Sequence, residues 1–476
     1  MNAPLYRQLA EKLQRAIDHG SLKSGDRLPS VRELSEREQV SLATAVTTYR
    51  HLENIGLVEA RPKSGFFVRE RAHRLGEPEM QRTPARAKTV TVVDTIMQVI
   101  SESRQPGLVP LGAACASPTL YPTAKLRKLL AVQDGDNLDA IGRYGMSMGL
   151  PALREQIVKR YAHLDVLLHP DNIIVTIGAM EAINLCVRAV AKPGDTIALE
   201  SPTYFGILQI IESLGMKALE IPTDPRTGIS LDALDLATQK AGAVKAVIVM
   251  PTVQNPLGST MPDENKKRLV AMMEERGIPV IEDDIYGELA FARQRPRPLK
   301  AWDKTGNVML CSSFTKNIAP GFRVGWVDAG RWQEAITHLK FTNTVSTPVV
   351  FQSAIAKFME NGGYEHHMRH LREAFQEQIR YVRESVEKHF PTGTKLTRPE
   401  GGFLLWVELP KQIDSIALFE RAMAEKIYIA PGKIFTSGKR FDNYIRLNCG
   451  YPWSSELERG LTRLGRICEE MLKENS

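Results

Sequence analysis

Lys316 stands in a stretch whose residue types could anchor a reactive carbonyl compound, "SSFTKNIAPGFR" at positions 312–323. Ser313 and Thr315 precede the lysine, and Arg323 follows it by one short loop. A lysine amine can form an imine with an aldehyde, while hydroxyl groups and a guanidinium can bind a phosphate. Lys316 alone is also compatible with an ordinary solvated side chain, so the prediction of an anchor depends on residues elsewhere in the chain.

Residues suited to the rest of such a ligand follow several apolar segments, where strands are expected to end. In open α/β sheets, ligands bind outside the carboxyl ends of the strands. Gly178 begins a helix whose first backbone amides can bind an anion. The residues expected at this site are Gly178, Ala179, Met180, Tyr204, Asn255, Asp283, Tyr286, Ser313, Thr315, Lys316 and Arg323.

A pyridine aldehyde phosphate accounts for all of these residue types. Asp283 suits a protonated ring nitrogen, which makes the ring electron-withdrawing. Asn255 and Tyr286 suit the ring oxygen, and Tyr204 suits stacking on the ring face. Each residue also has a simpler interpretation, because Asp283 could cap a helix, Asn255 could belong to an ordinary turn and Tyr204 could be a core aromatic. Their joint occurrence favours the single ligand.

The elements that must position these residues alternate between strand-like and helix-like from about residue 91. Buried apolar strands between helices predict a mostly parallel sheet covered on both faces. After residue 364, a long helix leads into three strand-like segments, which indicates a smaller α+β subdomain over 364–476. The strands expected in the large sheet are "NIIVTIG", "DTIALE", "KALEIP", "VKAVIVM", "IPVIEDD", "NVMLCSS" and "RVGWVDA".

Residues 1–69 form a separate pattern of three helices and a hairpin. The second helix begins with Ser30 followed by Glu33, which is a capping box, and the third begins after Ser41. This order predicts a winged helix-turn-helix, although a small helical cap with a hairpin would show the same pattern. Residues 70–90 hold two prolines and many charges and are expected to be a linker. The large domain then covers residues 91–476.

Composition narrows the class of protein. Hydrophobic residues make up 43% and charged residues 25%, as in soluble globular proteins. No apolar run is long enough to span a membrane and the start does not read as a secretory signal, so we expect a cytoplasmic protein. The five scattered cysteines contain no C-x-x-C pair, which argues against disulfides and a metal site.

The net charge of +7 is concentrated near the start of the chain. Residues 1–90 hold 16 Lys and Arg against 11 Asp and Glu, which leaves only +2 for the remaining 386 residues. A modest basic excess can simply keep a protein soluble. Its concentration in one segment favours a polyanionic partner, such as DNA, for that segment.

Residues 110–476 resemble a fold-type I aminotransferase of class I/II. The resemblance rests on "RYGMSMGLPALRE", "SPTYFG", "NPLG", "DDIYGE", "SSFTKNIAPGFRVGW" and "YIRLNCG", which occur in family order. It implies that Lys316 holds pyridoxal 5′-phosphate (PLP) as a Schiff base and that Asp283 contacts the pyridine nitrogen. It further implies that Tyr144 reaches the phosphate of a partner subunit in a homodimer and that Arg446 binds a substrate carboxylate. Arg446 could instead simply pair with a neighbouring carboxylate.

Residues 1–69 resemble the GntR-type winged helix, most strongly at "SGDRLPSVRELSE". Leu42 departs from the family pattern, because many members carry an arginine there. Arg50, Arg61 and Lys63 are better interpreted as phosphate contacts, which position a protein without specifying sequence. The DNA-binding residues that the resemblance implies are Arg32, Ser41, Ala43, Thr44, Thr47, Arg50, Lys63 and Gly65.

A GntR-type head joined to an aminotransferase-like body is the architecture of the MocR subfamily of bacterial regulators, which the whole chain resembles. The resemblance implies a transcription regulator that binds double-stranded DNA and is associated with the nucleoid while it is bound to that DNA. An amino compound would displace Lys316 from PLP by forming an external aldimine, and Arg446 hints that this effector is an amino acid. The alternatives are an active aminotransferase with an accessory DNA-binding domain, and a structural relic that binds PLP.

Overall fold

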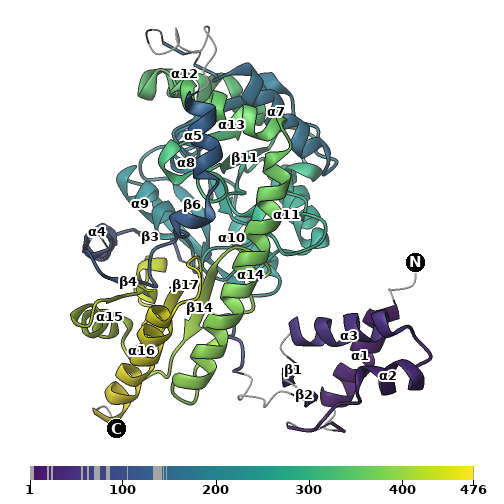
Figure 1. The fold of residues 1–476 in the computed structure, drawn as a ribbon. Coiled ribbons are helices and arrows are strands. Elements are labelled where there is room, and N and C mark those ends of the chain that lie inside the picture. Colours follow the sequence, from purple (N-terminus) through teal and green to yellow (C-terminus); the bar gives the residue numbers. More distant parts are fainter. Residues whose placement is uncertain are drawn as a thin grey trace. The chain divides into compact units, whose positions relative to one another are not determined.

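The computed structural model divides into two compact units, Met1–Arg74 and Leu75–Ser476, which are described separately (Figure 1). The described residues are 5–18, 21–22, 25–54, 57–61, 64–68, 75–81, 86–103, 105–131, 142, 144–145 and 147–474.

The first unit has the predicted order of three helices and a hairpin. Helices α1 (Leu5–Asp18), α2 (Val31–Arg37) and α3 (Leu42–Asn54) precede the antiparallel strands β1 (Val58–Arg61) and β2 (Gly65–Val68). The capping box on α2 is confirmed, because the Glu33 amide donates to Ser30 Oγ (3.2 Å) and the Ser30 amide donates to Glu33 Oε2 (2.7 Å). Tyr49 stacks on Phe66 with ring centroids 4.4 Å apart, so the hairpin is packed against α3.

The second unit is built around a mixed sheet with the strand order β3-β7-β6-β9-β10-β11-β12-β5. The strands from β7 to β11 are parallel, which confirms the predicted mostly parallel sheet, whereas β12 runs antiparallel to both of its neighbours. The bounds are β3 (Lys88–Thr89), β5 (Ile173–Thr176), β6 (Thr196–Ser201), β7 (Lys217–Asp224), β9 (Ala246–Val249), β10 (Val280–Asp283), β11 (Val308–Ser313) and β12 (Gly325–Asp328).

Helices cover both faces of this sheet, because alternate strand residues enter different cores. Ile281 and Met309 pack with α8, α9 and α12, whereas Val280 and Val308 pack with α10 and α11. Towards β5, the second face is covered by α7 and α13. The bounds are α7 (Pro151–Ala162), α8 (Ala179–Val190), α9 (Phe205–Ser213), α10 (Leu231–Thr238), α11 (Asp263–Glu275), α12 (Gln333–Thr344) and α13 (Val349–Glu360).

A smaller subdomain follows, with its own core. Strands β14 (Leu404–Glu408) and β17 (Tyr444–Asn448) form its centre, and α16 (Ser455–Glu474) packs beside α14 (Gly363–His389) (Figure 1). Helix α14 belongs to both cores, because Leu371 and Phe375 lie in the core of the large sheet and Val382 and Val386 in that of the subdomain. This single helix therefore connects the two cores.

Part of the stretch expected to be a linker pairs with the second unit. Lys88–Thr89 adds a short antiparallel strand to β7, and Val90 is buried in the core beside α8. Upstream, Glu77 forms an ion pair with Arg226 (2.5 Å). A charged stretch that contains prolines can therefore bind to the edge of a sheet through a few hydrogen bonds and ion pairs. The partners of these contacts lie far away in sequence, so the stretch itself does not reveal them. In the described parts of the chain, no helix is both long and apolar enough to cross a membrane.

Candidate functional site

The ends of three neighbouring strands bring the predicted anion-binding residues together. Ser313 at the end of β11 pairs with Gly325, and Gly325 pairs on its other side with Thr176 at the end of β5. A Cβ atom on Gly325 would lie 2.5 Å from the Gly178 carbonyl carbon, so only glycine allows this approach. The antiparallel course of β12 is therefore what brings the Arg323 loop beside the N-terminus of α8.

The predicted phosphate contacts form one hydrogen-bonded group at this point. Arg323 Nη1 donates to Thr315 Oγ1 (3.3 Å), and the Thr315 amide donates to Ser313 Oγ (3.3 Å). Gly178 has a φ of +79°, and a Cβ there would lie 2.6 Å from Arg323 Nη2. No side chain caps α8, so the amides at its start, on Ala179 and Met180, suit an anion.

Lys316 lies beside this group with its amine held in place. Its Nζ atom donates to the Ala114 carbonyl oxygen at 2.7 Å. Burial lowers the pKa of Lys316, and the cationic Arg446 and Arg323 act in the same direction, while Cys115 and Asp283 oppose them. A lowered pKa increases the share of neutral amine, which is the form that attacks a carbonyl carbon.

Asp283 ends strand β10 and is 3% exposed. One carboxylate oxygen accepts a hydrogen bond from the Ile285 amide (3.2 Å). Burial raises the pKa of Asp283 to about 7, and the neighbouring Asp284 acts in the same direction. A cationic ring nitrogen beside this carboxyl group would favour its ionised form.

Arg446 and Asn255 are in direct contact, and Arg446 also acts on the pKa of Lys316. Arg446 Nη1 donates to Asn255 Oδ1 (3.1 Å), and Nη2 donates to the Gly112 carbonyl oxygen (2.7 Å). Within the part of the chain that the structure describes, two buried polar atoms here have no hydrogen-bond partner, Arg446 Nε and the Tyr286 hydroxyl oxygen. Such atoms are uncommon in folded proteins, and at a ligand site they indicate groups that the ligand satisfies.

The residues present fit pyridoxal phosphate. The Gly178 cradle excludes a Cβ, the Tyr286 hydroxyl is buried without a partner, and the lysine, carboxylate and guanidinium groups flank one another. Tyr204, expected to stack on the ring, is the residue at the N-cap position of α9, and its side chain makes no capping hydrogen bond to the described helix. Tyr144 differs from these buried residues in its exposure, because it is 89% exposed.

The segment around Cys115 belongs to the site but was not predicted from the sequence. The backbone of Ala114 accepts from Lys316, and that of Gly112 accepts from Arg446. Cys115 is exposed, and it is one of the neighbours that act on the pKa of Lys316, Arg446 and Tyr204, which places it near them. The only signal was the run of small residues in "LGAACASP", which permits close backbone approach.

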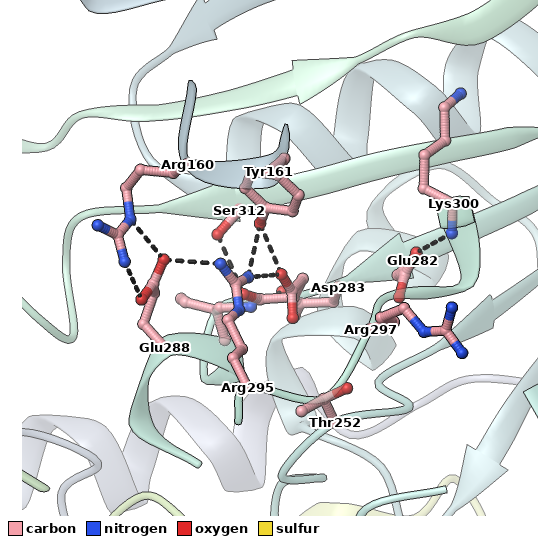
Figure 2. A network of polar contacts seen from close by, with 12 residues as sticks. Arg160, Tyr161, Thr252, Glu282, Asp283, Glu288, Arg295, Arg297, Lys300 and Ser312 are labelled. Atoms are coloured by element: carbon pink, nitrogen blue, oxygen red, sulfur yellow. Dashed lines mark hydrogen bonds and ion pairs between the residues drawn. The ribbon is translucent and has the colours of Figure 1, made fainter. Parts of the chain in front are cut away.

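A second group of charged residues, also not predicted, lies next to Asp283 and is shown in Figure 2. Asp284 accepts from the Tyr161 hydroxyl group (2.6 Å) and pairs with Arg295. Arg295 also pairs with Glu288 (2.6 Å), which pairs in turn with Arg160 (2.8 Å). Although burial opposes it, Arg295 and Arg160 hold the pKa of Glu288 below its ordinary value. We name these five residues the Asp284 network.

The residue after Lys316 is tied to the first turn of α14. Asn317 Nδ2 donates to the Tyr364 hydroxyl oxygen (2.9 Å), and His367 Nε2 donates to the Asn317 carbonyl oxygen (2.6 Å). Burial lowers the pKa of His367, which favours the neutral ring. A displacement of the Lys316 backbone would therefore act directly on α14.

In the first unit, most residues expected to contact DNA are exposed. Arg61 pairs with Glu59 (2.7 Å) and lies over the Phe67 ring. Lys63 lies outside the described residues. The exposed residues are Arg32, Ser41, Ala43, Thr47, Arg50, Arg61 and Gly65, whereas Thr44 is half-buried.

Two family models match the chain, one for each unit. Residues 123–464 match the aminotransferases of class I and II, and residues 5–68 match the bacterial regulatory proteins of the gntR family. Over 463 residues the chain is 37% identical to YjiR of Escherichia coli, an uncharacterized HTH-type transcriptional regulator, covering 97% of this chain and 98% of that one. This chain belongs to the MocR-type regulators.

Other comparisons agree with this assignment. The MocR-type chain is 36% identical to YdcR of Escherichia coli, a second uncharacterized HTH-type transcriptional regulator, covering 98% of this chain and 99% of YdcR. A crystal structure of Pyrococcus horikoshii kynurenine aminotransferase, in complex with PMP, has a TM-score of 0.72 and 29% identity, covering 81% and 96% of the two chains. The cofactor of the aminotransferase-like unit is pyridoxal phosphate.

Proposed function

We propose that this protein is a PLP-dependent transcription regulator that senses an amino compound at Lys316. When bound, PLP would supply an electrophilic carbon that can be joined either to the Lys316 amine or to an effector amine. Lys316 would hold the cofactor and be available for exchange, Asp283 would hold the ring nitrogen, and Ser313, Thr315 and Arg323 would hold the phosphate. The observation that carries the proposal is this cofactor site in the same chain as a GntR-type DNA-binding unit.

The environment of Arg446 supports an effector with a carboxylate group. Arg446 is 1% exposed and its guanidinium lies over the Phe435 ring at 5.0 Å, while Nε has no hydrogen-bond partner among the described residues. A charge-assisted hydrogen bond from a buried guanidinium is among the stronger polar contacts. An amino acid, with its amine on the cofactor and its carboxylate at Arg446, satisfies both ends of the site.

The contacts of Asn317 support a route from ligand to subdomain. Released from the cofactor, Lys316 no longer fixes its own backbone, and Asn317 links that backbone to Tyr364 and His367 on α14. The opposite half of α14 lies in the subdomain core. A ligand changes this arrangement only to the extent that it binds one state more tightly than the other.

The test is operator binding by wild-type protein and by Lys316→Ala, each loaded with PLP, across a panel of α- and ω-amino acids. The operator is taken from genomic DNA bound by the protein. We expect at least one amino acid to change wild-type affinity severalfold and to leave Lys316→Ala unaffected. An equal response in the variant would show that the amine exchange is not the signal.

The other function that these residues allow is transamination, with Lys316 as general base once released and Asp283 supporting the electron sink. Its support is the lowered pKa of Lys316, which suits a base. Addition of an amino acid, followed by a keto acid, distinguishes the two by absorbance. A sensor stops after the amine exchange, whereas an aminotransferase completes repeated cycles.

We also propose a homodimer in which Tyr144 reaches the cofactor phosphate of the partner subunit. The exposure of Tyr144 supports this, because a ring that is 89% exposed is available to a second chain. Light scattering after size exclusion gives the mass of the assembly. Tyr144→Phe is expected to weaken PLP binding without changing that mass.

A further inference from the structure

In a winged helix-turn-helix the third helix enters the major groove, and the first two turns of α3 lack the side chains that usually read bases. Its first two turns are Leu42-Ala43-Thr44-Ala45-Val46-Thr47-Thr48. Bidentate reading of guanine needs arginine or lysine, and that of adenine needs asparagine or glutamine. None of these four residue types occurs between Leu42 and Thr48.

The hydroxyl groups on this part of α3 are engaged within the protein. Ser41 Oγ accepts from the Thr44 amide (3.1 Å) and shares a hydrogen with Thr44 Oγ1 (2.8 Å). Thr47 Oγ1 donates to the Ala43 carbonyl oxygen at 2.8 Å. Thr48 is buried and donates to the Thr44 carbonyl oxygen. The hydroxyl hydrogens that could recognise a base edge are therefore largely used.

Leu42 is an exposed apolar side chain at the start of α3. It is 53% exposed, whereas the exposed face that runs along α3 holds Ala43, Thr47 and Arg50, which are spaced three or four residues apart. The N-terminal residues of a recognition helix are the ones that contact base edges, and Leu42 is the first residue of α3.

We propose that Leu42 is a specificity-determining residue that contacts the 5-methyl group of a thymine in the operator. The thymine methyl is the apolar group that bases present in the major groove, and small apolar side chains pack against it. The basic excess of residues 1–90 and the exposed Arg32, Arg50 and Arg61 supply the phosphate contacts that hold α3 in the groove. This inference rests on the proposed function as a DNA-binding regulator and deepens it.

The test begins with selection of bound sequences from a random duplex library by the full-length protein. Each thymidine of the selected site is then replaced with deoxyuridine, which removes only the methyl group. We expect one replacement in each half-site to weaken wild-type binding roughly 3- to 10-fold, as loss of one buried methyl group implies. In Leu42→Ala, the same replacement is expected to cost less than about 2-fold.

Two further variants complete the experiment. Leu5→Ala removes a leucine of equal exposure, 53%, from α1 of the same unit, and is expected to keep the full thymine dependence. Leu42→Arg is expected to select guanine at the position where the wild type selects thymine. An equal cost of deoxyuridine in wild type and Leu42→Ala at every position would overturn the inference. Failure of the wild type to bind any duplex would overturn the proposed function, and the inference with it.

Discussion

Two adjacent carboxylates, Asp283 and Asp284, are equally buried but have different partners. Asp283 accepts one backbone hydrogen bond and otherwise faces Lys316 and the site. Asp284 accepts from the Tyr161 hydroxyl group and pairs with Arg295, inside the Asp284 network. The first is left to be satisfied by a ligand, and the second is satisfied by the protein.

The difference shows how one strand end can serve two purposes. A buried carboxylate without a cation is costly, so Asp283 destabilises the cofactor-free fold. The Asp284 network lies directly behind it and connects α7 with the loop after β10, so the strand end remains fixed while the site is empty. We infer that Asp283 is positioned mainly by its neighbour's contacts.

The largest expected effect is on stability, and it tests directly whether Asp283 and Asp284 have different roles. Asp284→Asn leaves Arg295 with one buried carboxylate partner instead of two, and we expect it to lower the free energy of unfolding by about 3 kcal/mol. Asp283→Asn, the matched change one residue earlier, is expected to cost less than about 1 kcal/mol because it removes a desolvated charge. Urea unfolding of the cofactor-free proteins, followed by tryptophan fluorescence, measures both. Equal losses would remove the distinction between the two residues.

Asp283 should also give the cofactor-free protein a pH dependence of stability. Its pKa of about 7 lies above the ordinary 3.8, so between these values the folded state keeps a proton that the unfolded chain has released. Stability is therefore lost as pH rises from about 4 to 7, by up to about 1.4 kcal/mol for each pH unit. The measurement is the unfolding free energy of wild type minus that of Asp283→Asn from pH 4 to 8. A difference that does not change with pH would contradict the assigned environment.

A smaller effect is expected at Gly178, on the phosphate side of the site. Alanine there must adopt a φ of +79° and would bring its Cβ within 2.6 Å of Arg323 Nη2. We expect a loss of 1–2 kcal/mol in PLP binding, or about 10-fold, because both the backbone and Arg323 must shift. Gly194→Ala has a similar φ of +89° with open space around it, so it serves as the control for backbone strain. Equal changes in PLP affinity in the two variants would argue against a cradle at Gly178.

The smallest expected effect is that of Ser313→Ala. The Ser313 hydroxyl oxygen accepts from the Thr315 amide, and one phosphate contact is expected from it. Its loss should weaken PLP binding by about 1 kcal/mol, or roughly 5-fold, as removal of one hydrogen bond usually does. Ser312→Ala is the neighbouring control, because Ser312 Oγ donates to the Asp284 carbonyl oxygen instead. Titration of PLP by absorbance compares the two, and an equal loss would leave Ser313 without a special role.

The comparison of Asp283 and Asp284 also shows what the sequence could predict. Seven strands of the large sheet, all but the short edge pieces, followed from apolar periodicity, and Asp283 followed from its place at the end of one of them. Asp284 has the same type and burial, and its partners Tyr161 and Arg295 come from distant parts of the chain. Local pattern cannot identify such partners, so the network was missed.

The same limit applies to residues 86–90 and to the Cys115 segment. Both stretches are held by contacts with strands or side chains far away in sequence. The motif around Lys316, by contrast, is compact in sequence because the loop between β11 and β12 brings its residues together locally. Contacts between residues close in sequence were predictable, whereas contacts between residues far apart in sequence were not.

That loop has a consequence for chain length. Ser313 and Gly325 are paired with each other in the sheet, so the eleven residues between them form a closed ring that carries Lys316 and Arg323. Both ends of the ring are fixed by the sheet. An inserted residue would therefore have to bulge out of the ring or move the Lys316 amine away from the Arg323 guanidinium. The length of the ring therefore sets the distance from the Lys316 amine to the Arg323 guanidinium. Loops elsewhere on the surface tolerate added length much better, and this one should not.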